Sequence, residues 1–423
     1  MENTTHKWFR LDNAAIIVPS TAKGSDTRVF RLVCELTEEV DPEILQKALD
    51  DTLEEFPHFN VVLRQGLFWH YLEGTSLRPV VEEEHLQACA PIYQPGRRSL
   101  LYRVSYFGKR INLEVFHVLA DGTGAFAVLN HLTAVYLSLR HGLNYIPDKD
   151  SLSSVVEKNS DAFRQFYSKE KTSSQLKQMT GIRAFQIPQD RDGYMRNHLL
   201  EGIVSASQFI AEAKKLNTTA GILTVTLYIE AILQIMPERK RKYPIVISVP
   251  VNLRQFFASA TTRNFFGVIN ISYYASEYDG TLESIMTSVR ESFQKQLNND
   301  SIRGTMNSYS ALAQNPIIKL VPLFFKDRVI HYFSSRALKG TTGTMSNLGK
   351  ISMQPDFLPY IDHFSAFMAT ANMQICVSTL GDRMVFGAVS AYGEHRVLAN
   401  FFRNLVKRGI HVELATNDYD IRE

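Results

Sequence analysis

A histidine, an aspartate and a glycine stand in the spacing His-x-x-x-Asp-Gly at His117, Asp121 and Gly122. Imidazole is the side chain best suited to accept a proton near neutral pH. A strand-like run precedes the motif and a helix-like run follows it, so the turn between them can aim His117 into a cleft. The spacing therefore predicts a general base that activates a hydroxyl or an amine.

The strand that leads to the motif decides the environment of His117. Because side chains alternate along a strand, Ile111, Leu113, Val115 and His117 share one face. A histidine at the end of an apolar row is poorly solvated, which disfavours its charged form and favours the neutral form that a base needs. The other interpretation is a buried histidine whose ring is satisfied by a backbone carbonyl.

Asp121 and Gly122 have structural interpretations. The Asp121 side chain either caps the helix that begins near Gly122 or forms a buried ion pair that fixes the turn and so positions His117. Gly122 suits a sharp strand-to-helix turn with a positive φ.

Two further clusters carry polar groups at the ends of apolar runs. Arg254 follows the apolar strand 243–251, and an arginine there is expected to pair with a carboxylate, of which Asp121 is the predicted one. A surface arginine is the alternative. Residues 344–349 are small and polar, and they interrupt an extended run. Ser346 or Asn347 could donate a hydrogen bond to an oxyanion, or the segment could be a plain turn.

Periodicity predicts strands and helices in alternation, which is typical of an α/β fold. A crossover linker with one or two short helices is expected over 142–192. Hairpin turns are expected at 65–66, 108–109 and 381–382. The predicted strands are 29–36, 59–64, 68–72, 101–107, 111–118, 243–251, 266–274, 372–380 and 384–391. The predicted helices are 41–56, 124–139, 205–216, 219–234, 282–296, 311–333 with a break at Pro322, and 396–407.

Composition excludes several classes of protein. The chain has 423 residues, is 45% hydrophobic and carries a net charge of +3, so neither nucleic acid nor a charged membrane surface is implied as a partner. Three widely spaced cysteines argue against a disulfide framework and against a zinc site, and no metal is expected. The polar N-terminus and the lack of a long apolar run predict no signal peptide and no transmembrane segment, and hence a cytoplasmic protein.

Taken in order along the chain, the motifs resemble those of one superfamily. They are the His117 motif, PVNLR at 250–254, NFFG at 264–267 and SNLG at 346–349, with WFRLDNAA at 8–15 as the opening stretch. The set resembles the chloramphenicol acetyltransferase-like acyltransferases, which include the condensation domains of nonribosomal peptide synthetases. Within that superfamily the chain looks closest to bacterial alcohol acetyltransferase-like proteins.

The resemblance implies two similar α/β halves, each a mixed sheet with helices, and a tunnel at their interface. We place the halves at 1–175, with the His motif, and 176–423. It also implies that His117 takes the acceptor's proton, that Asp121, Gly122 and Arg254 are structural, and that Ser346 and Asn347 lie near the tunnel. The acyl donor would be a thioester of coenzyme A or of a carrier-protein phosphopantetheine arm, with no permanently bound cofactor.

Two departures narrow the prediction. Condensation domains usually carry two consecutive histidines, whereas Phe116 precedes His117 here, which makes an alcohol or amine acceptor the favoured prediction over peptide-bond formation. The plant acyltransferase motif Asp-Phe-Gly-Trp-Gly is absent. The alternative to an O- or N-acyltransferase is a non-catalytic, accessory domain that binds a carrier protein or an apolar ligand.

Overall fold

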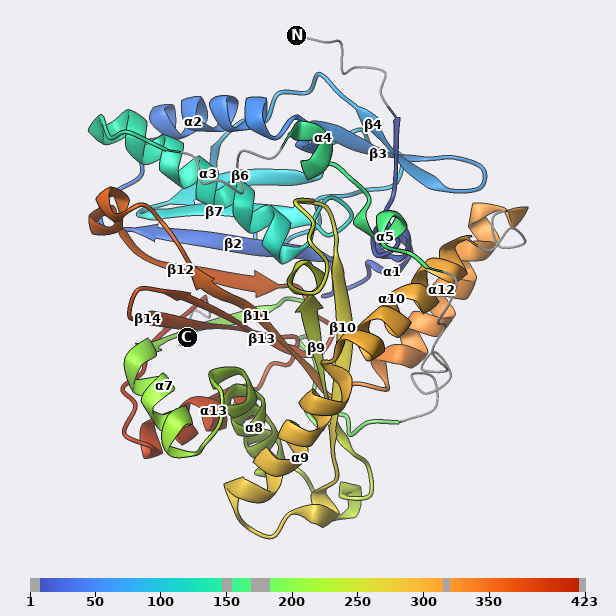
Figure 1. Cartoon of the computed structure of the whole chain (residues 1–423), viewed down its shortest axis with the longest axis vertical. Helices are drawn as coiled ribbons and strands as arrows, with labels where there is room; N and C mark the ends of the chain where they lie inside the picture. Colours follow the sequence, from blue (N-terminus) through green and yellow to red (C-terminus); the bar gives the residue numbers. More distant parts are fainter. Residues whose placement is uncertain (1–7, 147–153, 169–182, 315–319, 418–423) are drawn as a thin grey trace.

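Two large sheets lie one above the other in the centre of Figure 1, and helices pack against each of them. The computed structural model describes residues 8–146, 154–168, 183–314 and 320–417. One sheet has five strands and the other has seven, and a third, small sheet has three. This arrangement of mixed sheets and helices in two parts confirms the predicted α/β fold. The predicted tunnel between the parts stays a prediction.

The five-stranded sheet contains the strand that ends next to His117. Its order is β12-β2-β7-β6-β5, and every neighbouring pair is antiparallel except β5 with β6. Every residue of β7 after Arg110 is buried, as expected for a strand with a partner on each side and a covered face. The strands are β2 (Val29–Leu36), β5 (Glu82–Glu83), β6 (Tyr102–Phe107), β7 (Arg110–Phe116) and β12 (Ile361–Met368).

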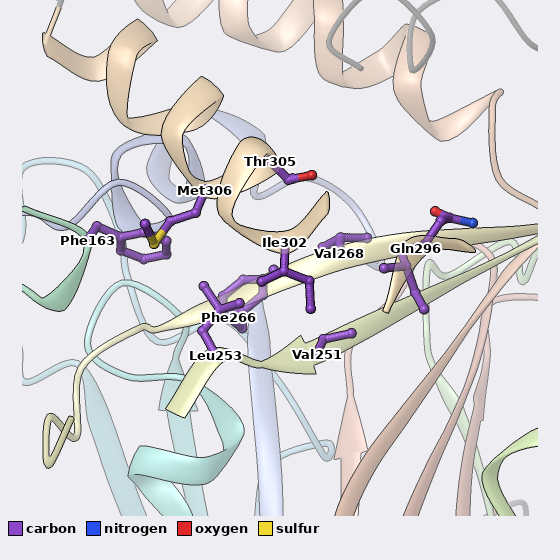
Figure 2. A pocket seen from close by; sticks show the side chains of 11 residues that line it. Phe163, Val251, Leu253, Phe266, Val268, Gln296, Ile302, Thr305 and Met306 are labelled. Carbon is purple, nitrogen blue, oxygen red and sulfur yellow. The ribbon is translucent and has the colours of Figure 1, made fainter. Parts of the chain in front are cut away.

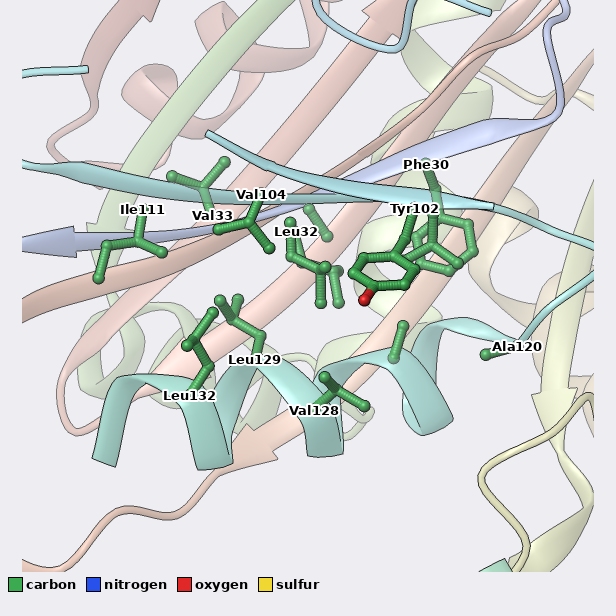
Figure 3. Close-up of a cluster of buried hydrophobic side chains, with 14 of the residues drawn as sticks. Phe30, Leu32, Val33, Tyr102, Val104, Ile111, Ala120, Val128, Leu129 and Leu132 are labelled. Carbon is green, nitrogen blue, oxygen red and sulfur yellow. The ribbon is translucent and has the colours of Figure 1, made fainter. Parts of the chain in front are cut away.

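Two helices, α2 (Pro42–Glu55) and α3 (Gly122–His141), pack on each other and cover one face of this sheet. Figure 3 shows Val128, Leu129 and Leu132 of α3 pointing at apolar side chains of the strands above them. Burying each such side chain contributes about 1.5–3 kcal/mol. The helix ends at Gly142, whose φ of +65° suits a residue without a Cβ.

The seven-stranded sheet has the order β10-β9-β11-β13-β14-β8-β15. In this sheet β11 runs parallel to β9 and β13, and the other pairs are antiparallel. Its strands are β8 (His198–Ser205), β9 (Ile245–Asn252), β10 (Phe266–Tyr273), β11 (Gly343–Ile351), β13 (Met373–Leu380), β14 (Arg383–Ser390) and β15 (Glu413–Thr416). The small sheet, β1-β4-β3, consists of β1 (Trp8–Arg10), β3 (Val61–Gln65) and β4 (His70–Gly74).

Four helices pack together below the seven-stranded sheet in Figure 1. They are α7 (Ala206–Lys215), α8 (Ala220–Leu233), α9 (Leu282–Gln296) and α13 (Arg396–Lys407). The Ser205 and Thr219 side chains cap α7 and α8 by accepting from Gln208 N and Ile222 N, as Ser and Thr at these positions predict. The described residues also form the α-helices α1 (Val18–Thr21), α4 (Val155–Lys158), α5 (Ala162–Gln165), α10 (Asn299–Gln314) and α12 (Leu323–Leu338). Short 3-10 turns are η2 (Ala15–Ile17), η3 (Pro57–Phe59), η4 (Glu238–Lys240), η5 (Leu253–Gln255), η6 (Ala275–Glu277) and η7 (Pro355–Tyr360).

The two large sheets are joined by β12. This strand lies late in the chain, yet it pairs with β2 of the five-stranded sheet. Ser378 Oγ of β13 donates to Phe364 O of β12 at 2.7 Å, and a Cβ on Gly387 of β14 would lie 2.1 Å from Ala366 O. The division of the chain into halves at residues 175 and 176 stays a prediction. One strand of the five-stranded sheet, β12, comes from the predicted C-terminal half.

The described residues correct several predicted elements. Residues 344–349 form no turn, because they lie inside β11, where a bulge between Asn347 and Gly349 accommodates the small polar residues. Periodicity missed β8, β12, β15 and most of α10. In β12 the polar His363 and Ser365 are buried, so the strand lacks an apolar pattern. Part of the predicted linker, 147–153 and 169–182, lies outside the described residues; the short helices α4 and α5 lie in the part that is described.

The hairpin turns at 108–109 and 381–382 are confirmed by the register of β6 with β7 and of β13 with β14. The three cysteines are buried and free. In the described part of the chain, no single helix has the length and apolar composition to cross a membrane. Only α7 and α8 together reach that length and composition, and they meet at 83°.

Candidate active site

His117 is the first residue after β7, at the edge of the five-stranded sheet that faces β10. Its backbone N–H donates to Arg28 O at 2.9 Å, and Leu119 N donates to Phe116 O across the turn that follows. Arg28 itself has a φ of +57°, an unfavourable conformation for a residue with a side chain. The residue that accepts the His117 N–H, Arg28, therefore has a left-handed backbone conformation.

The His117 ring is oriented by Asn264. His117 Nδ1 lies 3.0 Å from Asn264 Oδ1. Asn264 Nδ2 donates to His117 O at 3.1 Å and to the Asp12 carboxylate at 3.2 Å. Both of these partners are acceptors, so the amide nitrogen must face them and the amide oxygen must face the ring. Nδ1 then carries the hydrogen, and Nε2 of the neutral ring has the free lone pair.

Two aromatic rings pack around the imidazole. Phe30 of β2 meets it edge-on at 5.2 Å between ring centroids, and Phe266 of β10 lies at 5.5 Å. Burial among these groups lowers the pKa of His117 below its ordinary value of 6.5, against the opposing effect of the Asp121 carboxylate. The imidazole is therefore neutral at neutral pH, and it lies between one strand of each large sheet.

Asp121 performs both of the roles that its position predicts. As the N-cap of α3, it accepts from Gly124 N through Oδ1 at 2.8 Å. Its Oδ2 accepts from Arg254 Nη1 at 2.9 Å and from Phe265 N at 2.8 Å. The carboxylate is buried, so these bonds replace the water that it loses.

Arg254 is held by more than its carboxylate partner. Its guanidinium also donates to Thr261 O at 2.9 Å and to Arg263 O at 2.6 Å. These bonds hold the loop between β9 and β10 against the start of α3, since Arg254 and the two carbonyls belong to that loop and Asp121 to the helix. The structure thus brings Asp121 and Arg254 together, and it places the pair next to the turn that carries His117.

The two glycines at the start of α3 have different surroundings. Gly122 does not have a positive φ, which corrects the expectation for the turn. A Cβ at Gly122 would lie 3.2 Å from a Leu348 methyl, whereas a Cβ at Gly124 would lie 1.8 Å from Thr262 O. Gly124 is therefore the glycine that the close approach of the β9–β10 loop requires, and the single-residue spacing of the two glycines was its only sequence signal.

The segment with Ser346 and Asn347 reaches the site through a neighbour. Leu348 is the residue that touches Gly122. Asn347 is exposed, and its side-chain oxygen accepts from Gly349 N at 2.8 Å within the bulge of β11. Ser346 is half-buried and pairs with Cys376 of β13. The described contacts do not bring either side chain to the His117 ring.

Two more residues of the site had no role predicted from the sequence. Asp12 is fully buried, and burial raises the pKa of its carboxyl to about 6, despite the nearby Arg263 guanidinium. Its Oδ1 accepts from Ala15 N at 2.8 Å, and its Oδ2 is the oxygen that receives the Asn264 amide. Asp12 and Asn264 lie in the opening stretch and in the NFFG motif, so those motifs were the available signals.

An apolar cavity lies beside the site (Figure 2). It lies between the edge strand β10 and helix α10, and the room inside it that a water-sized sphere can reach is about 20 Å³, enough for about one water molecule. Phe266 lines this cavity and also contacts the His117 ring. Other lining residues are Val251, Leu253, Val268, Ile302 and Met306.

Solved structures with the same arrangement of elements cover nearly the whole chain. The first condensation domain of the calcium-dependent antibiotic synthetase is 13% identical with a TM-score of 0.66, over 97% of this chain and 100% of that one. The trichothecene 15-O-acetyltransferase from Fusarium sporotrichioides is 11% identical with a TM-score of 0.64, over 96% of each chain. The chain has the condensation-domain fold.

A third structure with this fold, the starter condensation domain of rhizomide synthetase in complex with C8-CoA, is 13% identical with a TM-score of 0.60. The match covers 95% of this chain and 94% of that one. No protein-family model and no curated protein matches the sequence. Identities this low show the condensation-domain fold alone, so the chemistry has to be argued from the residues of this chain.

Proposed function

We propose that the protein is an acyltransferase that moves an acyl group from a thioester to an alcohol or an amine, with His117 as general base. The observation that carries the proposal is the orientation of the imidazole. Asn264 holds Nδ1–H and leaves Nε2 as the proton acceptor. A neutral ring with one fixed tautomer is what general-base catalysis requires.

In the proposed reaction the acceptor O–H or N–H donates its proton to His117 Nε2. The acceptor oxygen or nitrogen attacks the thioester carbonyl carbon and forms a tetrahedral intermediate. The intermediate collapses with cleavage of the carbon–sulfur bond, and the departing sulfur takes the proton from the imidazolium. A thioester is already activated, so a base and correct positioning supply most of what the reaction needs.

The structural neighbours support a thioester donor. The structural neighbours include an acetyltransferase and condensation domains, one of them solved with C8-CoA. The co-substrate is proposed to be acyl-CoA or an acyl carrier protein, and the acceptor a small alcohol or amine.

The remaining predicted residues keep supporting roles in this proposal. Asp121, Gly122 and Arg254 hold the turn that carries His117. Ser346 and Asn347 stay proposed tunnel or oxyanion residues, for which Leu348 supplies the nearest contact with the motif. An oxyanion donor acts on the negative charge that develops on the thioester oxygen.

The test is thiol release by the purified chain with a panel of acyl-CoAs, each with and without alcohol and amine acceptors. We expect thiol release that depends on the acceptor, together with the acylated product by mass spectrometry. His117→Ala should lower the rate by about 10²–10⁴-fold, the range for loss of a general base, with an unchanged thermal midpoint. His131→Ala is the matched control. His131 is also partly buried, but it lies in the middle of α3 and its ring bonds the Tyr145 hydroxyl.

Other outcomes would favour a different function or a different base. Full activity in His117→Ala would remove the base from the proposal. Release only from acyl-carrier substrates would favour a condensation-type reaction. No release with any thioester would favour the second candidate, a non-catalytic domain that binds a carrier protein or an apolar ligand.

A further inference from the structure

Helix α12 exposes most of its large apolar side chains to solvent. Phe324, Phe325, Val329, Tyr332 and Phe333 are each more than half exposed, whereas Leu323 is buried. The usual surface helix buries such side chains, since its apolar stripe faces the core. Here Lys326 Nζ donates to Phe68 O at 2.8 Å, and Asp327 accepts from Ser20 Oγ at 2.6 Å. The side of α12 that faces the protein therefore carries bonded polar side chains beside the buried Leu323, and the outer side carries most of the rings. Figure 1 shows α12 along the outer side of the molecule, next to α10.

Two rows of side chains at helical spacing form this outer face. One row is Phe325, Val329 and Phe333, each of them more than half exposed. The other row alternates rings and cations, in the order Phe324, Arg328, Tyr332 and Arg336. The Arg328 guanidinium lies 4.5 Å from the centre of the Phe324 ring, and Arg336 Nη1 donates to the Tyr332 hydroxyl at 2.6 Å.

The tip of the β3–β4 hairpin extends the same surface. Leu323 N donates to Leu67 O at 2.8 Å, so the tip lies against the first turn of α12. Leu67 and Trp69 at this tip are 71% and 57% exposed. The other tryptophan of the chain, Trp8, is 72% exposed and packs its ring 5.1 Å from Tyr71 on the same small sheet. We call the two rows of α12 and this hairpin tip the aromatic face.

We propose that the aromatic face binds the surface of an anionic lipid bilayer. Exposed apolar groups that are contiguous mark an interaction site, and an amphipathic helix with Phe and Trp beside Arg and Lys is the composition that lies in a membrane interface. Tryptophan and tyrosine favour that interface because their rings are apolar and carry one polar group. Arg328 and Arg336 are placed to meet lipid phosphates while the rings enter the acyl boundary.

The charges on the aromatic face argue against a second copy of this chain as its occupant. A two-fold dimer through the face would gather Arg328 and Arg336 of both copies in one interface. The acid on α12, Asp327, points inward to Ser20 and so does not neutralise them. An acidic protein would match the cations, but it would need a fixed shape complementary to rings from two separate segments. Lipid acyl chains adapt to any such shape.

The aromatic face is continuous with the segment that reaches the candidate site. Helix α1 packs against α12, and the chain runs back from α1 to Asp12, which holds the Asn264 amide beside His117. A bilayer bound at the aromatic face would therefore lie on the side of the molecule where residues 8–21 connect the surface to the site. The proposal itself stands on the surface residues and does not depend on the reaction.

The test is cosedimentation of the full chain with phosphatidylcholine vesicles, with and without phosphatidylglycerol, at low and high salt. We expect binding to the anionic vesicles that weakens as salt rises. Phe325→Ser/Val329→Ser/Phe333→Ser should weaken that binding by at least about 10-fold, since it removes three apolar side chains that would enter the bilayer. The matched control is Ile210→Ser/Val406→Ser/Leu414→Ser, which removes exposed apolar side chains far from α12.

A charge pair separates the electrostatic contribution. Arg328→Gln/Arg336→Gln should reduce binding to anionic vesicles, whereas Arg239→Gln/Lys240→Gln, which removes two cations of η4, should not. Unchanged circular dichroism and thermal midpoints show that each variant is folded. Failure of the parent chain to bind anionic vesicles, or equal binding by the triple variant, would overturn the proposal. A dimer in size-exclusion chromatography that the triple variant dissociates, without vesicle binding, would assign the face to protein contact instead.

Discussion

Two buried carboxylates lie seven residues apart along the chain, and each is paired with arginine, but they join different parts of the molecule. Glu114 lies in the middle of β7, where Arg31 Nε of β2 donates to it at 2.9 Å and Arg103 of β6 donates from the other side. All three residues belong to the five-stranded sheet. Asp121 lies at the start of α3, and its partner Arg254 comes from the loop after β9 of the seven-stranded sheet.

The two carboxylates therefore have different expected roles: Glu114 stabilises a sheet, and Asp121 positions a turn. The Glu114 bonds connect neighbouring strands that backbone hydrogen bonds already hold in register. The Asp121 bonds connect two segments that no shared ladder aligns, at the turn between β7 and α3. In the proposed site, that second connection positions His117 relative to Asn264 and Phe266. Similar chemistry therefore holds a sheet together in one place and sets the geometry of a site in the other.

The strongest way to break this comparison is to remove each carboxylate. Asp121→Ala should lower the free energy of unfolding by about 3–5 kcal/mol, because it removes the carboxylate partner of Arg254. Glu114→Ala should also destabilise the chain, but by less, because Arg31 keeps its ion pair with Glu84. Urea unfolding measures the loss. Only Asp121→Ala should also lower the thiol-release rate per folded molecule, at a temperature where both variants stay folded. Equal residual activity in the two variants would contradict the distinction.

The two glycines at the start of α3 sharpen the comparison. A Cβ on Gly124 would meet the backbone of the β9–β10 loop, and a Cβ on Gly122 would meet a side chain. Gly124→Ala would place a methyl 1.8 Å from Thr262 O and should push the β9–β10 loop away from α3. We expect a loss of about 1–3 kcal/mol, the cost of forcing an extra group into a packed contact, and a lower rate. Gly122→Ala meets only the Leu348 methyl at 3.2 Å, which can rotate away, and serves as the matched control. Thermal unfolding with the thiol-release assay separates them, and a larger effect at Gly122 would refute this reading of the contact.

Much of the candidate site could be predicted because its signals are local. The spacing of His117, Asp121 and Gly122 sets a turn and a helix cap within six residues, and Arg254 follows an apolar strand that leaves its charge needing a partner. The pairing of β12 with β2 could not be predicted this way, because it joins residues more than 300 positions apart in a strand that buries His363 and Ser365. Asn264 lay in a recognised motif, but its role depends on three acceptors and donors that only the fold brings together.

For helix α12, the sequence predicts the helix but not the side that faces the protein. Its apolar residues predict a helix, and the helix is present, but the pattern does not say which face is buried. A periodic apolar stripe is normally assigned to the core. In this chain the contacts of Lys326 with Phe68 and of Asp327 with Ser20 turn the stripe outward. Net charge was equally uninformative, since the overall value of +3 does not reveal that Arg328 and Arg336 lie together among aromatic rings.

The smallest expected effect is the pH dependence, and it tests the contact between the two sheets at a single atom. Burial lowers the pKa of His117 below 6.5, so kcat/KM should be flat near neutrality and fall only on the acid side of that value. The Asn264 oxygen accepts from Nδ1–H and binds the charged ring more strongly than the neutral one, which raises the pKa. Asn264→Ala should therefore move the acid limb to still lower pH.

Asn264→Ala should also lower the plateau by about 10-fold, because the ring then keeps only the bond with its own backbone and part of the population has the wrong tautomer. The matched control is Asn112→Ala, which removes a buried amide from β7 that donates to Glu84 inside the five-stranded sheet. That variant should lose stability and keep the pH profile of the parent. If both variants keep the parent profile and plateau, Asn264 only packs against the ring. If only Asn264→Ala changes them, the amide from one sheet controls the proton acceptor of the other.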